Sequence, residues 1–323
     1  MLYTRRDIGK LALAAGAASG CGTTSESPAV GSAPSSMFGG VQIGIITYSF
    51  RALPGGAEEV LQYCVDCGLY AIELMSGPAE SYAGVPPLPP VPRGPDGRRR
   101  ELTPEEQEAR QKAVEARRKW RLSAPMDKYK ELRAMYEDAG VKTFAFKLPP
   151  AMDMPDEEYE YIWNVAETMG ADHVTMELPH DDELLQRVAE YAAKRRLRIA
   201  FHTHGQGGAS GFDKALAASD YTALNFDVGH YFAVNGESPV PLVEKYSGRI
   251  ASLHLKDRQS KEDGGRNMPW GQGGTPLAEV LQLMKAKGYE FPASIEYEYE
   301  TPEGSSVLAE IKKCREYCEN ALA

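Results

Sequence analysis

This 323-residue chain lacks long apolar runs, basic stretches near the predicted site, and nucleotide-binding motifs. No apolar run reaches the roughly 20 residues that a membrane-spanning helix needs. The formal net charge is −10 and no basic stretch lies near the predicted site, which argues against a nucleic-acid partner. Neither GxGxxG nor GxxxxGK followed by Ser or Thr occurs, which argues against a doubly wound nucleotide-binding fold.

Cysteine is also scarce, and its spacing excludes a zinc ribbon. Cys64 and Cys67 fall in the first predicted helix, whereas Cys314 and Cys318 are spaced CxxxC in the last. The first and last helices of a closed barrel are neighbours, so a disulfide between them is conceivable in an oxidising compartment. Buried free thiols are the favoured alternative.

The N-terminus has the pattern of a targeting segment. Arg5 and Arg6 precede a weakly apolar stretch, and small residues stand directly before Cys21. This pattern predicts a twin-arginine signal with a lipoprotein-type cleavage site in residues 1–21. Residues 22–40 are rich in Ser, Pro and Gly, which is typical of a flexible tether. We therefore expect an exported, periplasmic protein whose only membrane contact is a lipid anchor at Cys21.

From residue 41 onward, short apolar runs alternate with amphipathic segments of helical period. Eight such units in residues 41–323 predict an α/β fold, a (β/α)8 TIM barrel. Residues 76–124 form a long insertion after the second strand, proline-rich at first and then highly charged. We expect a lid or rim there, with a disordered loop as the alternative. The predicted strands are residues 41–49, 69–75, 142–148, 173–178, 198–203, 223–228, 249–256 and 293–299.

Acidic and imidazole side chains stand at the ends of these apolar runs. Asp227, His254 and Glu296 end three strands that are adjacent in the ring. A single histidine at a strand end is more often satisfied by backbone than by metal, but three ligand types on consecutive strands favour a site. Carboxylate and imidazole together suit Mn²⁺, Co²⁺, Zn²⁺, Ni²⁺ or Mg²⁺. The whole set comprises Glu73, Glu177, His202, His204, Asp227, His230, His254 and Glu296.

The segments NFDVGH, SLHLKD and ASIEYE, with the spacing between them, resemble the xylose isomerase-like TIM barrels. The resemblance covers residues 41–323 apart from the insertion, and it is strongest in the last three strands. That superfamily contains sugar isomerases and epimerases, sugar dehydratases and apurinic-site endonucleases. The resemblance implies one divalent metal ion, with Mn²⁺ preferred, held by Asp227, His254, Glu296 and a fourth ligand.

The fourth ligand is where this sequence departs from the family pattern. The glutamate that usually ends the fifth strand is replaced by His202, and His204 follows two residues later on the same strand face. Glu177, one strand earlier, is the alternative ligand, and both can take part. We expect the catalytic groups to be Glu177, Glu296 and His204.

Further polar residues are expected to bind the substrate. His230 resembles a family position that contacts substrate hydroxyls, and Lys256 and Arg258 can hold a polar substrate or its developing oxyanion. Lys147 and Trp270 are weaker candidates. Trp270 is included because its ring can stack on a sugar. The expected partner is a small sugar or keto-sugar, and a homo-oligomer is left open.

These parts predict a metal-dependent sugar isomerase or epimerase that abstracts a proton next to a carbonyl through an enediolate. The alternative reaction is β-elimination, as in a 3-keto-glycoside lyase or hydratase. A sugar-binding lipoprotein without turnover is the alternative of another class. An endonuclease is disfavoured because it needs several more histidines around a multi-zinc cluster.

Overall fold

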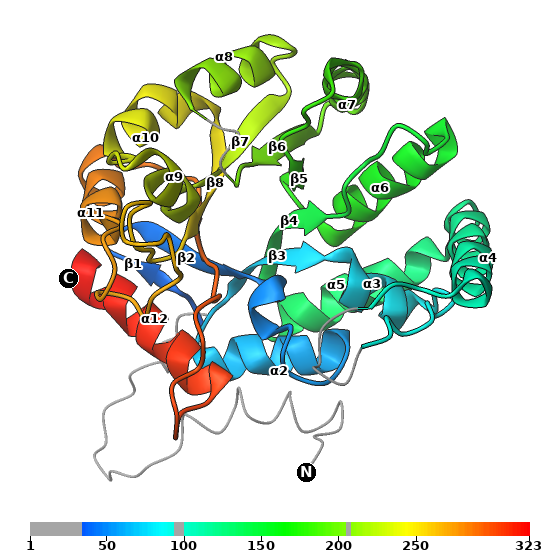
Figure 1. Ribbon diagram of the computed structural model, residues 1–323, viewed down its shortest axis with the longest axis horizontal. Helices are drawn as coiled ribbons and strands as arrows, with labels where there is room; N and C mark the ends of the chain where they lie inside the picture. The colour runs from blue at the N-terminus through cyan, green and yellow to red at the C-terminus, as the bar shows by residue number, and fades with distance from the viewer. Residues whose placement is uncertain (1–33, 94–99, 205–207) are drawn as a thin grey trace, which may run out of the picture.

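Parallel strands close into a ring in this protein, as the computed structural model of residues 34–93, 100–204 and 208–323 shows (Figure 1). The strands follow one another in chain order around the ring, and β2 pairs with β9 to close it. The (β/α)8 barrel expected from the sequence is confirmed. The ring strands are β2 (Val41–Ile46), β3 (Ala71–Met75), β4 (Lys142–Lys147), β5 (His173–Glu177), β6 (Arg198–His202), β7 (Thr222–Asp227), β8 (Ile250–Leu255) and β9 (Ala293–Ile295).

Helices surround the ring in an outer layer (Figure 1). The main core lies between the two layers, where apolar strand residues face the apolar stripes of the helices. Short 3-10 helices, η1 (Thr47–Phe50) and η2 (Ser247–Arg249), follow β2 and precede β8. The α-helices are α2 (Ala57–Cys67), α3 (Ser76–Ala83), α4 (Pro104–Arg121), α5 (Met126–Asp138), α6 (Asp156–Met169), α7 (Asp182–Arg195), α8 (Ala209–Ala217), α9 (Val228–Asn235), α10 (Val240–Tyr246), α11 (Leu277–Lys287) and α12 (Val307–Leu322).

The folded part of the chain begins earlier than the expected tether boundary at residue 40. β1 (Met37–Phe38) pairs antiparallel with β2. Ser36 is fully buried; its hydroxyl donates to Ile43 O and accepts from the Tyr70 backbone N–H at 3.0 Å. These contacts fix the entry of the chain at the N-terminal ends of the strands, because Tyr70 directly precedes β3. The expected signal segment, residues 1–21, lies outside the described residues.

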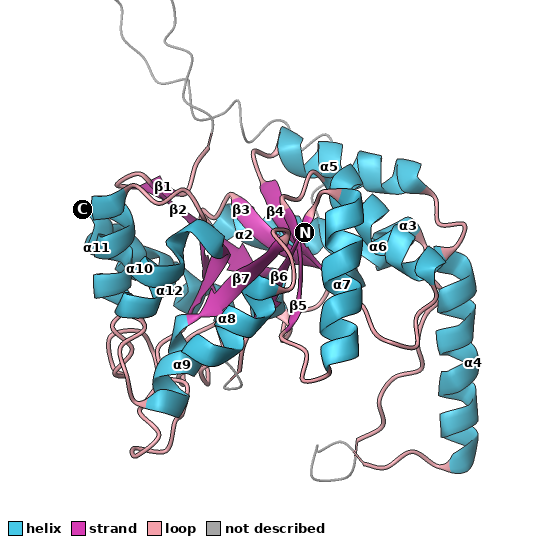
Figure 2. Ribbon diagram, turned by 90° about the horizontal axis from the view of Figure 1, so that it is seen from above, coloured by secondary structure: helices cyan, strands magenta, loops and turns pink. Residues whose placement is uncertain are grey.

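The described part of the insertion after β3 contains two helices, α3 and α4, and its last part is anchored by buried charges. Arg121, at the end of α4, donates to Glu80 on α3 at 2.8 Å and to Glu158 on α6 at 3.0 Å. The Tyr161 hydroxyl donates to Glu80 as well. α4 lies at the outer edge of the helix layer and projects along it, rather than over the strand ends (Figures 1 and 2). α4 thus forms a peripheral arm, and a lid or rim made by the insertion stays a prediction.

The four cysteines of the barrel are free and buried, which confirms the favoured prediction of buried free thiols. Cys64 and Cys67 lie on α2, and Cys314 and Cys318 lie on the neighbouring α12. Within the described residues, no helix combines the length and the apolar character that crossing a membrane requires.

Candidate metal centre

Four side chains meet inside the barrel at the C-terminal ends of its strands. His202, Asp227, His254 and Glu296 each offer one ligand atom, and these atoms all lie within 4.8 Å of one another. We call these residues the donor group. His202 ends β6 and Asp227 ends β7, whereas Glu296 directly follows β9, which is shorter than the expected strand. All four side chains are buried.

The two carboxylate oxygens of Asp227 have different roles: one caps a helix and the other faces the donor group. It is the N-cap of α9, and its Oδ1 accepts the backbone N–H of His230 at 2.6 Å. Its Oδ2 is buried and accepts no hydrogen bond, although the Lys256 ammonium lies 3.1 Å away. Burial raises the pKa of Asp227 to about 6, against the opposing charge of Lys256. Oδ2 is therefore an acceptor that lacks a full set of partners.

His254 is held between two carboxylates. Its Nδ1 lies 2.9 Å from Glu296 Oε2, and its Nε2 lies 2.6 Å from Glu73 Oε2. Burial disfavours the charged ring, but Glu73 and Glu296 outweigh that cost and raise the pKa of His254 to about 10. An ion at Nδ1 would replace a proton there, while the Nε2–H bond to Glu73 would persist.

His202 is the donor that the sequence left open. Its Nε2 lies 4.0 Å from Asp227 Oδ2, and its side chain is 1% exposed. Burial and the neighbouring His254 lower the pKa of His202 well below its usual value, so the imidazole is neutral and keeps a lone pair for a cation.

The donor group fits a divalent ion in number, charge and spacing. Two donors on opposite sides of an ion with bonds of about 2.0–2.3 Å lie roughly 4–4.6 Å apart, within the observed spread. Two imidazole nitrogens and two carboxylate oxygens suit Mn²⁺, Co²⁺ and Zn²⁺. The unsatisfied Asp227 Oδ2 is explained if it is a ligand.

Glu177 stands beside the donor group rather than in it. It pairs in register with His202 across β5 and β6, yet its side chain is 42% exposed. The Lys147 ammonium donates to Glu177 Oε1 at 3.1 Å, and His204 Nε2 lies 3.5 Å from Oε2. The geometry thus places His202 in the donor group, and Glu177 next to His204.

His204 and His230 extend the imidazole cluster towards the barrel mouth. One nitrogen each of His202, His204 and His230 lie within 4.8 Å of one another, and the rings of His204 and His230 are 4.5 Å apart. Both His230 nitrogens face cations, because Lys256 Nζ lies 2.9 Å from Nε2 and Arg258 bonds Nδ1. These two positive charges disfavour a second cation in this part of the cluster. Burial and Lys256 also lower the pKa of His230 to about 2, so its ring is neutral.

Arg258 and Trp270, two other residues expected to bind the substrate, are held by contacts outside the donor group. Arg258 donates to the carbonyl of Gly265 as well as bonding His230, so it ties the loop after β8 to that histidine. Trp270 packs against Tyr317 of α12, with ring centroids 5.7 Å apart, and lines a groove on that side of the barrel.

Glu73 was not assigned a role from the sequence, although it follows the same strand-end pattern. It is fully buried, accepts from Thr175 Oγ1 at 2.6 Å and from Asn225 Nδ2 at 3.1 Å, and contacts His254. Burial alone would raise the pKa of Glu73, but His254 lowers it to about 2, so it is a carboxylate that orients the His254 ring.

We expect Glu73→Gln to weaken binding of a divalent ion by about 10–100-fold, because the neutral glutamine removes the negative charge that fixes the orientation of the His254 ring. Chelator-competition titration measures this affinity. Glu80→Gln is the matched control, since Glu80 is an equally buried acid in the α3–α4–α6 cluster. Equal affinities in wild type and Glu73→Gln would show that His254 needs no such partner.

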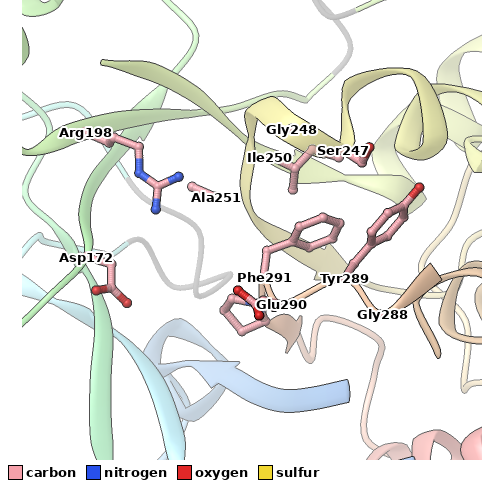
Figure 3. A pocket seen from close by; sticks show the side chains of 11 residues that line it. Asp172, Arg198, Ser247, Gly248, Ile250, Ala251, Gly288, Tyr289, Glu290 and Phe291 are labelled. Carbon is pink, nitrogen blue, oxygen red and sulfur yellow. The ribbon is translucent and has the colours of Figure 1, made fainter. Parts of the chain in front are cut away.

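A separate pocket of about 630 Å³ lies at the other end of the barrel (Figure 3). It is lined by residues that precede or begin β5, β6, β8 and β9, among them Asp172, Arg198 and Phe291. The active sites of TIM barrels lie at the C-terminal ends of the strands, whereas this pocket lies at their N-terminal ends. The pocket is therefore not part of the candidate centre.

Comparisons with known proteins agree with this architecture. A family model described as Xylose isomerase-like TIM barrel matches residues 61–317. An inosose dehydratase of Clostridium botulinum (strain Eklund 17B / Type B) is 36% identical over 78 residues, which is 23% of this chain and 26% of that protein. An L-ribulose-5-phosphate 3-epimerase of Salmonella paratyphi A is 26% identical over 144 residues, 43% of this chain and 49% of that protein.

Among solved structures, a xylose isomerase domain protein from Alicyclobacillus acidocaldarius subsp. acidocaldarius superposes with a TM-score of 0.60 at 16% identity. The match covers 87% of this chain and 98% of that one. Identity this low shows a shared fold only. The chain spans about a quarter to a half of the two curated relatives, so their activities are not transferred by the match.

Proposed function

This chain belongs to the xylose isomerase-like TIM barrel family, and from that membership we propose that it is a divalent-metal-dependent sugar isomerase or epimerase. Its reaction would begin with removal of a proton from the carbon next to a carbonyl of a sugar or keto-sugar. The observation that carries the proposal is the buried donor group of His202, Asp227, His254 and Glu296 at the strand ends.

The donor group would hold one divalent ion, for which Mn²⁺ is our first candidate. When bound, such an ion supplies Lewis-acid polarisation of the substrate carbonyl. The chain itself supplies the orientation of the donors, through the α9 cap on Asp227 and the Glu73 bond to His254. Because all four donors are buried, water has little access to them.

We assign proton removal to His204, with Glu177 as its partner. His204 Nε2 lies 3.5 Å from Glu177 Oε2, and its side chain is 60% exposed, so a substrate at the barrel mouth can reach it. Glu177 is in turn held by Lys147. This arrangement resembles a base oriented by a carboxylate, and returning the proton to another face or carbon gives epimerisation or isomerisation.

The substrate oxygens would meet His230 and Lys256. His230 lies beside His204, and its two ring nitrogens face Lys256 and Arg258, so it would place these two cations next to the substrate oxygens. Arg258 keeps His230 in place, and Lys256 adds a positive charge near a developing oxyanion.

Elimination is the second candidate reaction, and two observations favour it. One curated relative, 36% identical over 78 residues, is an inosose dehydratase. In addition, His202 replaces the glutamate that usually ends this strand in the two-glutamate epimerases. An enzyme that removes the same proton and then expels a β-substituent needs no second base on the opposite face.

Proton exchange in D₂O tests the proposal and separates its two forms. The metal-loaded protein is incubated with unphosphorylated keto-sugars, among them a 3-keto-glucoside, and deuterium uptake is followed by NMR. We expect exchange at the carbon beside the carbonyl, with an epimer or isomer as product. Release of free aglycone supports elimination instead. Tight sugar binding without exchange, unaffected by metal removal, supports a sugar-binding lipoprotein.

We further propose that the protein is exported and lipid-anchored at Cys21, which agrees with an unphosphorylated substrate. Radiolabelled palmitate incorporation in a bacterial host, lost in Cys21→Ala, is the direct test.

A further inference from the structure

Lys256 is a buried cation placed against the donor group. It follows β8, and its side chain is 2% exposed. Its Nζ lies 3.1 Å from Asp227 Oδ2 and 2.7 Å from Glu296 Oε2, two oxygens of the donor group. It also lies 2.8 Å from Glu298 Oε2 and 2.9 Å from His230 Nε2, nearer the barrel mouth.

The backbone is shaped to admit this side chain. A Cβ at Gly229 would lie 2.3 Å from Lys256 Cγ and 2.4 Å from Lys256 O, so no other residue fits there without a shift. Gly229 stands in the first turn of α9, between the N-cap Asp227 and His230. The same turn therefore places one donor and makes room for the lysine that contacts it.

A divalent ion and this ammonium cannot share the same oxygens at short range. An ion bound to Asp227 and Glu296 would lie roughly 2 Å from each oxygen. The ammonium is about 3 Å from those same atoms, so the two cations would be only a few ångströms apart in a buried region, where repulsion is poorly screened. Glu298 and His230 offer the ammonium partners that the ion does not need.

We propose that Lys256 competes with the divalent ion for Asp227 and Glu296, and that it withdraws from these two residues when the ion binds, keeping only Glu298 and His230 as partners. The lysine lowers the metal affinity of the centre. Its displacement presents the ammonium at the barrel mouth, beside His230, where the substrate oxygens would lie. Metal loading and completion of the substrate site are thereby coupled. The inference rests on the metal centre of the proposed function, but not on the reaction.

Metal affinity of Lys256→Met tests the competition without any substrate. Methionine keeps most of the side-chain length and removes the charge. Chelator-competition titration with Mn²⁺ and Zn²⁺ is expected to show binding about tenfold tighter or more than wild type. Lys147→Met is the matched control, since Lys147 bonds Glu177 instead of a donor carboxylate, and its effect is expected to be much smaller.

Glu298→Gln is expected to change the metal affinity in the direction opposite to Lys256→Met. It removes the charge of a partner that the ammonium would keep after withdrawing from the donor group, so metal binding is expected to weaken several-fold while the donor group is untouched. If Lys256→Met folds only with metal, the rate of metal loss to excess EDTA replaces the titration, and slower loss than from wild type is expected.

Unchanged or weaker binding by Lys256→Met overturns the inference, as does equal tightening by Lys147→Met, which would reflect net charge alone. If the protein turns over a sugar but Lys256→Met binds metal with the affinity of wild type, only the competition is refuted. A chain that shows the competition without turnover refutes only the proposed function.

Discussion

Asp227→Asn is expected to lose its divalent ion while the barrel stays folded. Asparagine is as good an N-cap as aspartate, so the bond from the His230 N–H that begins α9 is retained. The side-chain atom facing the donor group, however, changes from a charged oxygen to a neutral one or to an amide N–H. Loss of a direct ligand should cost more than the roughly 10–100-fold in affinity that an outer partner costs. Elemental analysis after dialysis measures the retained metal.

Asp181→Asn is the matched control for this variant. Asp181 is the N-cap of α7, where its Oδ1 accepts from the Glu183 N–H at 2.9 Å. The chemical change is identical, but the residue is not in the donor group, so metal content should equal that of wild type. Stoichiometric metal in Asp227→Asn would contradict the assignment of Asp227 as a ligand, and with it the metal centre as drawn.

His204→Gln is expected to lower the rate of substrate proton exchange by about 10²–10⁴-fold, the usual contribution of a positioned general base. Metal content should be unchanged, because His204 is outside the donor group and its side chain is 60% exposed. Glu177→Gln should have a smaller effect, since it only orients that ring. Exchange in D₂O and elemental analysis on the same samples measure both quantities.

His180→Gln is the control for a general effect of losing a surface imidazole, because His180 is exposed in the loop after β5. Loss of metal from His204→Gln would make His204 a ligand instead of a base. Undiminished exchange in His204→Gln would move the base to another group, with Glu177 the next candidate.

The barrel could be predicted from the sequence because its strands are buried on both faces and therefore read as apolar runs between turns. The helix α3 could not be. Its SGPAESYA sequence contains Gly77 and Pro78, which argue against a helix, but Pro78 falls in the first turn, where a backbone N–H has no helical partner anyway. The tether boundary was placed too late because two residues of antiparallel β1 are too few to give a pattern.

The choice between His202 and Glu177 needed three-dimensional information. The two are register partners at the ends of neighbouring strands, so alternation directs both towards the barrel mouth. Burial separates them: His202 is enclosed by the donor group, and Lys147 holds Glu177 at the rim. Glu73 carried the same strand-end signal, but its role depends on His254, 181 residues away in the chain.

The point where the chain enters the barrel has a practical consequence. Ser36 is fixed beside Tyr70, and Pro34 packs against Gly140 just before β4, so the folded domain begins at the end of the barrel opposite to the donor group. An attachment made directly ahead of residue 34 therefore joins the barrel at the end opposite to its mouth. Immobilisation through the N-terminus should preserve access for ions and sugars, whereas coupling through surface groups near the rim should obstruct it.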